Sequence, residues 1–496
     1  MKPISKVGDE SGVAVLTVLL AMTLVLILGG ALFLVAQVSL ERSVAATDAS
    51  RALDTAEAGL QTSADTLVGS FSAGSSGVIS GTMGDGSEYD VYWEADTALP
   101  WFTLTSTGYY PTKADTRGVR TVKAEVFTLN PWDFQYAGGM TGATVNGNVW
   151  VDGPFYVNDE LELSGTAGVH TGPLIIYDTT APGDGDLILD SASADIGSAG
   201  NPVPLFIDGE VVRLQNGSYY ADPVYSWAPE LEFPDLTQTQ LTYYRADNSA
   251  SPWLADVERP TAVLDVDSGQ ITPDNDTNLV LGRNIKIGTN QNASQAEIDA
   301  ALLDKADNPN DLNNPRVSIT KSGNTITMAF DNTGDVHPIL FVDGDVTFGD
   351  NQTTVRYSGI GTVVASGNIA IEGNLVPAGS TTSSDPATTT LNGFPQTNAL
   401  GLITRNNIHY EGKNSEWLAA ALYSGNVASF AKQGNFKGSV VTRNLDLGTN
   451  VPHLYTQPGF STKLPPKMPG AEARITSIIG WTELAPGAGT TTTTSP

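Results

Sequence analysis

The sequence has no cysteine among its 496 residues. Disulfide bonds, thiolate nucleophiles and zinc–thiolate sites are therefore excluded. Basic residues are also scarce, with 25 Lys and Arg against 54 Asp and Glu, and the net charge is −29. Because nucleic-acid phosphates would be repelled, we expect no nucleic-acid partner. This composition is typical of a solvated, exported surface protein, and a high-salt habitat would favour it as well.

Long apolar runs are lacking except for one, residues 11–40, which contain no charged side chain. A bilayer core about 30 Å thick needs roughly 20 apolar residues in a helix, so this run is long enough to span it. A secretory signal has a shorter apolar region and ends at a small-residue cleavage site. We therefore expect a retained transmembrane helix, although Ala45–Ala46 offers a candidate cleavage site.

The charges around this helix predict its orientation. Residues 1–10 carry Lys2, Lys6 and the free amine, and Arg42 lies on the other side. Lys and Arg favour the cytoplasmic side, so we expect residues 1–10 in the cytoplasm and the bulk of the chain outside the cell membrane.

Residues 41–70 continue the helix in amphipathic form. Their apolar residues recur every three or four positions, the spacing of one helix face; they are Ala46, Ala49, Leu53, Ala56, Leu60, Ala64 and Leu67. The residues Ser50, Ala52, Leu53 and the run Ala56-Glu-Ala-Gly-Leu60, placed after the apolar span, resemble the N-terminus of minor-pilin-like proteins of type IV pili (PilX type). The resemblance implies membrane anchoring and contact with other pilin-like subunits through this helix. The chain departs from the family pattern, since a cut after Gly8 would place Val13 where prepilins carry glutamate.

Residues 71–136 favour a small antiparallel sheet. The Gly/Ser-rich stretch 71–86 is expected to be a loop, and three alternating runs follow it at 87–95, 101–110 and 119–128. A helix followed by such a sheet resembles the pilin layout, in which the sheet covers the amphipathic face of the helix.

A short repeat dominates residues 137–484. Two turn-forming or polar residues, often Gly with Asn or Asp, precede a branched, any, branched triplet. The copies include Val149-Trp-Val151, Leu161-Glu-Leu163, Leu187-Ile-Leu189, Ile285-Lys-Ile287, Val346-Thr-Phe348, Ile369-Ala-Ile371, Ile408-His-Tyr410 and Leu445-Asp-Leu447. Successive copies after residue 340 are about 20 residues apart, which is typical of a parallel β-helix (β-solenoid). A β-sandwich remains the alternative, because its strands share the local pattern.

Residues 338–466 also resemble the β-helical C-terminal domain of minor-pilin-like and other exported proteins. The resemblance rests on Ile339-Leu-Phe-Val-Asp-Gly-Asp-Val346, 361–369 and 438–445, and it implies a fold without an assigned activity. The fold class is therefore mainly β, with a long N-terminal transmembrane and amphipathic helix, a small pilin-like sheet and a β-solenoid. We expect loop insertions at 218–260, 293–315 and 381–397, a last strand at 471–484 and a disordered Thr-rich tail at 485–496.

Catalytic and metal-binding groups are weakly indicated. Glycosidases use a pair of carboxylates, for which Asp343 with Asp345 and Asp265 with Asp267 are candidates, but Asp-Gly-Asp is also a plain turn. Three oxygen-rich stretches lack the EF-hand spacing, so no cofactor is expected and Ca²⁺ binding would be incidental; they are 274–278, 307–314 and Asp331-Asn332. The four histidines show no metal-ligand spacing: His170, His337, His409 and His453.

Aromatic residues near the first insertion are the best candidates for a binding surface. They are Tyr219, Tyr220, Tyr225, Trp227, Tyr243, Tyr244 and Trp253. Exposed rings would bind a glycan or a surface protein, whereas buried rings would only cap the solenoid.

The sequence thus favours a non-enzymatic, membrane-anchored structural or adhesive protein, and a candidate minor component of a pilus-like apparatus. A membrane-anchored β-helix enzyme acting on carbohydrates and a glycan-binding module remain the alternatives.

Overall fold

The structure is a computed structural model that divides into two compact units. The first contains Met1–Thr97, Trp101–Phe127 and Thr476–Pro496, and the second contains Ala98–Pro100 and Thr128–Ile475. The described residues are 10–67, 75–95, 101–138, 142–178, 185–245, 262–264, 284–287, 317–332, 338–342, 344–349, 353–413, 415–448, 452–455, 457, 460–471 and 475–484. The predicted mainly β fold, with one long N-terminal helix, an antiparallel sheet and a parallel β-solenoid, is confirmed.

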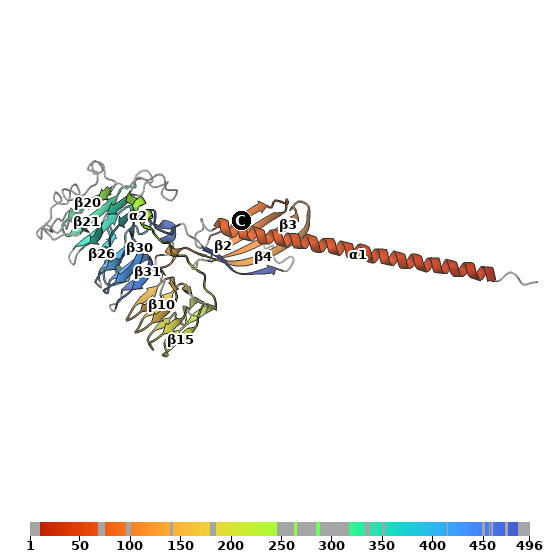
Figure 1. Ribbon diagram of the computed structural model, residues 1–496, viewed down its shortest axis with the longest axis horizontal. Coiled ribbons are helices and arrows are strands. Elements are labelled where there is room, and N and C mark those ends of the chain that lie inside the picture. Colours follow the sequence, from red (N-terminus) through yellow and green to blue (C-terminus); the bar gives the residue numbers. More distant parts are fainter. Residues whose placement is uncertain are drawn as a thin grey trace, which may run out of the picture. The chain divides into compact units, whose positions relative to one another are not determined.

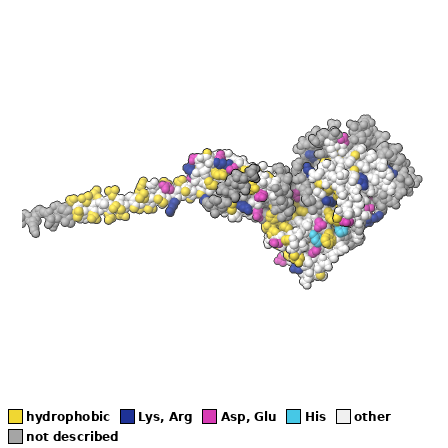
Figure 2. Space-filling model, turned by 180° about the vertical axis from the view of Figure 1, so that it is seen from behind, with side chains coloured by type: hydrophobic (Ala, Val, Ile, Leu, Met, Phe, Trp, Pro, Cys, Tyr) yellow, Lys and Arg dark blue, Asp and Glu magenta, His cyan; other side chains and the backbone are white. Residues whose placement is uncertain are grey.

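The first unit is built on α1 (Glu10–Leu67), a single uninterrupted helix. The side chains of residues 15–46 are exposed and mainly hydrophobic (Figures 1 and 2). Within the described part of the chain, α1 alone is long and apolar enough to cross a membrane. Beyond Thr47 the helix instead turns one face into a protein core, so the same helix has a lipid-compatible half and a packed half.

The packed half of α1 lies against an antiparallel sheet of β1 (Ser76–Thr82), β2 (Glu88–Ala95), β3 (Trp101–Pro111) and β4 (Thr116–Leu129). The prediction that 71–86 is only a loop is wrong, because Ser76–Thr82 pairs residue by residue with β2. Its Gly and Ser residues hid a strand whose side chains alternate between partly buried and exposed.

The strand β33 (Ile475–Leu484) is the fifth member of this sheet, next to β4. An ion pair of 3.0 Å between Arg120 Nε and Glu483 Oε1 joins the two strands. The prediction that this strand ends the solenoid is therefore wrong. Its alternating pattern indicated a strand, but such a pattern does not identify the sheet in which the strand pairs.

Small residues allow α1 and the sheet to approach closely. Ala52, Ala56 and Ala64 of the helix are fully buried. On the sheet, a Cβ added to Gly108 would collide with the backbone of Ala52 and Ala56. The contact thus requires glycine on β3 opposite alanine on α1.

The second unit is a solenoid whose coils contribute strands to three faces. The face that we call the strap face contains β17 (Ala221–Tyr225), β14 (Val203–Ile207), β11 (Leu174–Tyr177), β8 (Phe155–Asn158), β5 (Tyr136–Gly138), the middle parts of β31 (Asn435–Asp446) and β30 (Trp417–Phe430), β28 (Ala399–Thr404), β25 (Ile360–Ala365), β22 (Ile339–Val342) and β18 (Ala262–Leu264).

The second face, which we call the repeat face, contains β15 (Val211–Arg213), β12 (Leu187–Leu189), β9 (Leu161–Leu163), β6 (Ala143–Val145), the last parts of β31 and β30, β29 (Ile408–Tyr410), β26 (Ile369–Ile371), β23 (Asp345–Phe348) and β19 (Asn284–Ile287). The third face contains β16 (Ser218–Tyr219), β13 (Asp195–Ile196), β10 (Gly168–Thr171), β7 (Trp150–Asp152), β32 (His453–Tyr455), the first parts of β31 and β30, β27 (Leu375–Pro377), β24 (Thr354–Ser358) and β21 (Thr325–Phe330). The strand β20 (Val317–Ser322) pairs antiparallel with β21.

The order of the coils along the solenoid differs from their order in the sequence. Coils built from residues 136–225 occupy one part of the stack and coils built from 262–455 the other, as the sequence colours in Figure 1 show. They meet at one composite coil, in which β32 supplies the third face while β5 and β6 supply the other two. The start and the end of the solenoid therefore lie side by side in its middle, and neither forms an end of the stack.

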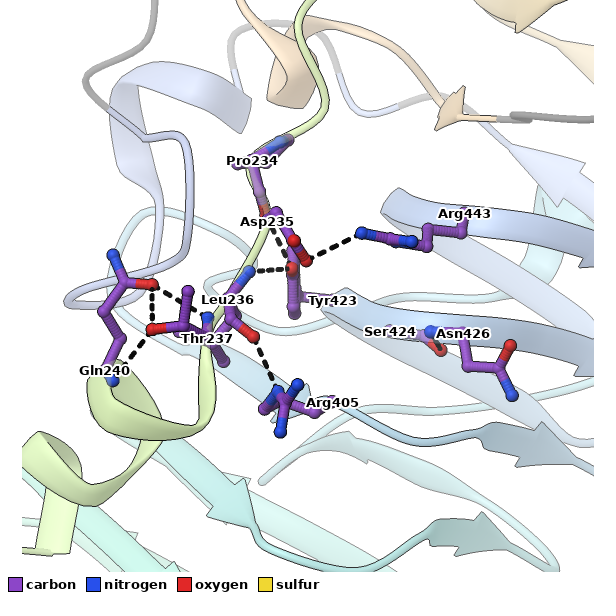
Figure 3. Close-up of polar contacts among 10 residues, drawn as sticks. All are labelled: Pro234, Asp235, Leu236, Thr237, Gln240, Arg405, Tyr423, Ser424, Asn426 and Arg443. Carbon is purple, nitrogen blue, oxygen red and sulfur yellow. Dashed lines mark hydrogen bonds and ion pairs between the residues drawn. The ribbon is translucent and has the colours of Figure 1, made fainter.

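A strap, residues 226–237, connects the two blocks of coils across the strap face (Figure 3). The hydroxyl of Tyr423 accepts a hydrogen bond from Leu236 N–H at 2.9 Å and donates one to Pro234 O at 2.5 Å. Arg405 Nε donates to Leu236 O at 2.7 Å, and Asp235 pairs with Arg443 at 3.0 Å.

The strap ends in α2 (Gln238–Arg245), which is capped by reciprocal hydrogen bonds. Gln240 N–H donates to Thr237 Oγ1, and Thr237 N–H donates to Gln240 Oε1. The insertion predicted at 218–260 thus begins later than expected, because β16 and β17 are still solenoid strands. The insertion at 381–397 is a loop with a short 3₁₀ helix, Pro386–Thr388, whereas 293–315 lies outside the described residues.

Coverage by the strap explains a difference between the faces. Strands of the strap face are buried on both sides and read as continuous apolar runs, such as Ile339–Val342 and Ala399–Thr404. Strands of the repeat face alternate, with the middle residue turned outward, as in Leu161–Leu163. The branched, any, branched triplets fall on the repeat face, except Val149-Trp-Val151, which lies on the third face.

Replacing Gly108 by valine tests the contact between α1 and the sheet. The added side chain would overlap the backbone of Ala52, so G108V should cost about 1–3 kcal/mol of stability. Hydrogen exchange of residues 48–67 in the detergent-solubilised chain should rise. The matched control is G84V, because a Cβ at Gly84 meets nothing within 4 Å. Equal exchange in both variants would contradict this packing.

Replacing Tyr423 by phenylalanine tests the attachment of the strap. The change leaves Leu236 N–H without its acceptor, at a cost of about 1–3 kcal/mol. Residues 229–241 should then exchange hydrogen faster and be cleaved sooner by protease. Y220F is the control, since that ring is exposed on the terminal coil. Unchanged exchange in Y423F would show that the strap is held by other contacts.

Candidate functional site

The predicted aromatic residues have different environments. Tyr219 packs against the solenoid core from the terminal coil, and burial raises its pKa. Tyr225 stacks on Phe206 with ring centroids 4.6 Å apart, and Trp227 meets the edges of both rings. These three side chains therefore cover the terminal coils, and Tyr220 is the exposed one, with 44% of its surface accessible.

The remaining predicted aromatic residues belong to or follow α2. Tyr244 is fully buried and donates a hydrogen bond to Lys467 O at 2.6 Å. The side chain of Tyr243 and the whole of Trp253 lie outside the described residues. The structure therefore does not bring the seven predicted residues together in one exposed patch.

The predicted carboxylate pairs gain little from the structure. Asp345 Oδ1 accepts hydrogen bonds from the backbone N–H and the side-chain amide of Asn368 in the next coil. This carboxylate thus fixes a turn between coils. Asp343, Asp265, Asp267, His337 and the oxygen-rich stretches 274–278 and 307–314 lie outside the described residues. Among the side chains that the structure describes, no group of three His, Asp or Glu is placed to hold a metal ion.

A different cluster of rings lies on the third face. Trp150 stacks on His170 in the neighbouring coil, with centroids 4.3 Å apart and planes 6° from parallel. His453 of the composite coil is in register with Trp150 on the other side. Tyr455 lies beside His453 and stacks on Trp417 at 5.2 Å. We call these five side chains, with their polar neighbours Asp152, Asp195 and Lys437, the aromatic strip.

The position of each ring follows from the alternation of the strands. Val151, Val169 and Leu454 point into the core, so the flanking residues point outward. Trp150 is 47% exposed, although the indole is a large apolar group. At the other end Trp417 is covered, because its Nε1–H donates to Ser383 O in the loop 381–397 at 2.7 Å. In Figure 2, histidine side chains lie at the solenoid surface beside hydrophobic and acidic ones.

The ionisable groups of the aromatic strip are partly desolvated. Burial raises the pKa of Asp195, although His170 beside it opposes the shift. Burial lowers the pKa of His453, against the pull of Asp152, and burial also lowers the pKa of Lys437. His170 Nε2 is 3.5 Å from Asp195 Oδ1 and makes no hydrogen bond. At neutral pH, the His453 ring is therefore an uncharged group beside acidic acceptors.

A second polar cluster lies on the repeat face. The ring of His409 contacts Ser429 Oγ at 2.5 Å and Glu411 Oε1 at 2.9 Å, and Lys432 pairs with Glu411 at 2.7 Å. The hydrogen bonds from Lys432 and then from His409 lower the pKa of Glu411. Hydroxyl, imidazole and carboxylate occur here in the order of a nucleophile, base and orienting acid. An acyl-transfer site would also need free donors for an oxyanion, whereas Ser429 lies in β30 between the paired strands β29 and β31. We interpret this cluster as a polar ladder between coils.

The aromatic strip was missed from the sequence, although one signal was present. In the branched, any, branched triplet the middle residue faces outward, and in Val149-Trp-Val151 that residue is tryptophan. The other members could not be found in this way, because His453 and Tyr455 join Trp150 only through the composite coil.

Comparisons with known proteins give one structural neighbour to report. No family model matches the chain, and no curated protein matches it. Among solved structures, it is similar to the crystal structure of the competence-associated pilin ComZ from Thermus thermophilus, with 16% sequence identity and a TM-score of 0.40. The similarity covers 88% of this chain and 98% of that chain. Independently of this neighbour, the long apolar helix fits the N-terminus of a pilin.

Proposed function

We propose that the chain is a non-enzymatic, membrane-anchored structural or adhesive protein of the cell surface, and a minor component of a type IV pilus-like apparatus. Residues 11–40 would hold it in the membrane with the N-terminus in the cytoplasm. The solenoid would then lie outside and present its surface to the surroundings.

One observation carries this proposal, namely the division of α1 into two environments. Its apolar half is fully exposed, and such a surface in water is unfavourable by about 25 cal/mol for each Å² of apolar area. Its second half is a structural part of the antiparallel sheet. A cleavable signal would be separate from the folded protein, whereas α1 continues without a break from one half into the other.

The exposed half also suits contact with other helices. Gly29 and Gly30 lie side by side in the apolar part, and nothing approaches either position within 4 Å. Small residues allow neighbouring helices in a membrane or a bundle to pack closely. This feature supports assembly with other pilin-like subunits through the same helix.

Charges placed in the apolar half test the membrane anchor. Each Arg in the middle of a spanning helix costs about 2.5–3.5 kcal/mol on insertion scales, so the double variant L24R/L28R should leave the membrane fraction. V44R, beyond the span, is the matched control and should remain. Sedimentation with membranes before and after alkaline extraction gives the measurement. Wild-type protein in the soluble fraction would contradict the anchor.

N-terminal sequencing of native protein from membrane and sheared-surface fractions tests the pilus assignment separately. Protein that begins at Asp9 in the sheared fraction is the expected result. An intact Met1 confined to membranes would remove the filament role and leave a stand-alone anchored protein.

A further inference from the structure

An exposed tryptophan in the middle of a paired sheet is unusual for this solenoid. Among the described residues of the solenoid, the large apolar side chains that are exposed are Trp150 and three near the terminal coil: Leu214, Tyr220 and Val224. Trp150 is far from any chain end, since its strand has paired neighbours, β10 and β32, on both sides. The core at this level is already filled by Val151. The indole is therefore not needed to bury the coil.

The rings around Trp150 are arranged along the direction in which the coils stack. His170 lies on one side, and on the other side come His453, Tyr455 and Trp417, with neighbouring ring planes within 20° of parallel in each measured pair. Adjacent strands of a sheet are about 4.8 Å apart, so the aromatic strip offers contacts at a regular spacing along one line. Such a surface suits an elongated ligand better than a compact one.

The polar members of the aromatic strip restrict the chemistry of that ligand. Asp152 and Asp195 are hydrogen-bond acceptors next to the rings, and His453 is beside them. Acidic side chains here, together with the net charge of −29, repel phosphate, sulfate and uronate groups. The surface therefore offers aromatic contacts for C–H groups and acceptors for hydroxyl groups.

We propose that the aromatic strip is a binding site for an extended, neutral polysaccharide. Its sugar rings would place C–H groups against Trp150, and their hydroxyls would donate to Asp152 and Asp195. This inference rests on the adhesive role proposed above, to which it adds a class of ligand. The chemistry involves binding alone, with no bond made or broken.

A purely structural role and a peptide ligand for the same surface become outcomes of the test. Stacked rings could serve only to stabilise neighbouring coils, as cross-strand aromatic pairs do in other sheets. Alternatively, the carboxylates could bind a basic peptide.

The experiment is affinity electrophoresis of the full chain in detergent. Gels contain dextran, mannan or hydroxyethyl cellulose as neutral polysaccharides, alginate as a polyanion, or no polymer, and free polylysine is tested as a competitor and a ligand. We expect at least one neutral polysaccharide, and not alginate, to retard the wild-type protein. W150A should weaken this binding by about tenfold or more, as for an aromatic residue at the centre of an interface.

Matched variants separate binding from folding. W481A removes a tryptophan that is 55% exposed on the other unit, and it should bind like the wild type. D152N and D195N keep the shape of the side chain and should weaken binding without changing the thermal unfolding midpoint. These variants decide the question if W150A does not fold.

Several results would overturn the proposal. They are retardation by none of the neutral polymers, equal binding by W150A, D152N, D195N and W481A, binding of alginate as strong as that of the neutral polymers, and binding of polylysine alone. Loss of stability in W150A without any polysaccharide binding by the wild type would identify a purely structural ladder. Because the protein is purified in detergent, none of these results depends on the membrane fractionation that tests the anchor.

Discussion

The solenoid depends on the pairing of its first and last coils. Each coil of a parallel β-helix must bury its branched side chains on the next one, since none can do so alone. Here Tyr136–Gly138 pairs with Val440–Thr442, and Trp150–Asp152 pairs with His453–Tyr455, so both ends of the domain complete one stack in its middle. If these pairs were broken, two shorter solenoids would remain, each with an exposed edge.

Three features follow from this pairing. The chain must return from one end of the stack to the other, and residues 226–237 do so as the strap that Tyr423 and Arg405 hold against one face. The end of the solenoid is brought close to its beginning, so β33 can rejoin the sheet that packs on α1. The third face, which the strap does not cover, assembles the aromatic strip from residues that are about three hundred positions apart in the sequence.

The sequence predicted what local spacing determines. The uncharged run 11–40 and the periodic alanines after it indicated α1, and the triplets indicated coils of about 20 residues. It failed where partners are distant. Ile475–Leu484 was identified as a strand but assigned to the wrong sheet, and Ser76–Thr82 was hidden by its glycine and serine content. Tyr219 and Trp227 were chosen for their composition, whereas Trp150 gains its neighbours only when two ends of a domain pair. No local pattern contains that information.

The most direct test of the composite coil is a disulfide placed across it. Ala137 and Val441 are paired partners on neighbouring strands, and the Cα atoms of such partners lie within the range that a disulfide spans. Because the chain has no cysteine, A137C/V441C adds the only two thiols, and mild oxidation followed by mass spectrometry of tryptic peptides reports any bond. We predict an intramolecular disulfide between these residues, with none in the control A137C/A370C. Failure of A137C/V441C to form it while folded, or bonds between molecules alone, would contradict the joining of the first and last coils.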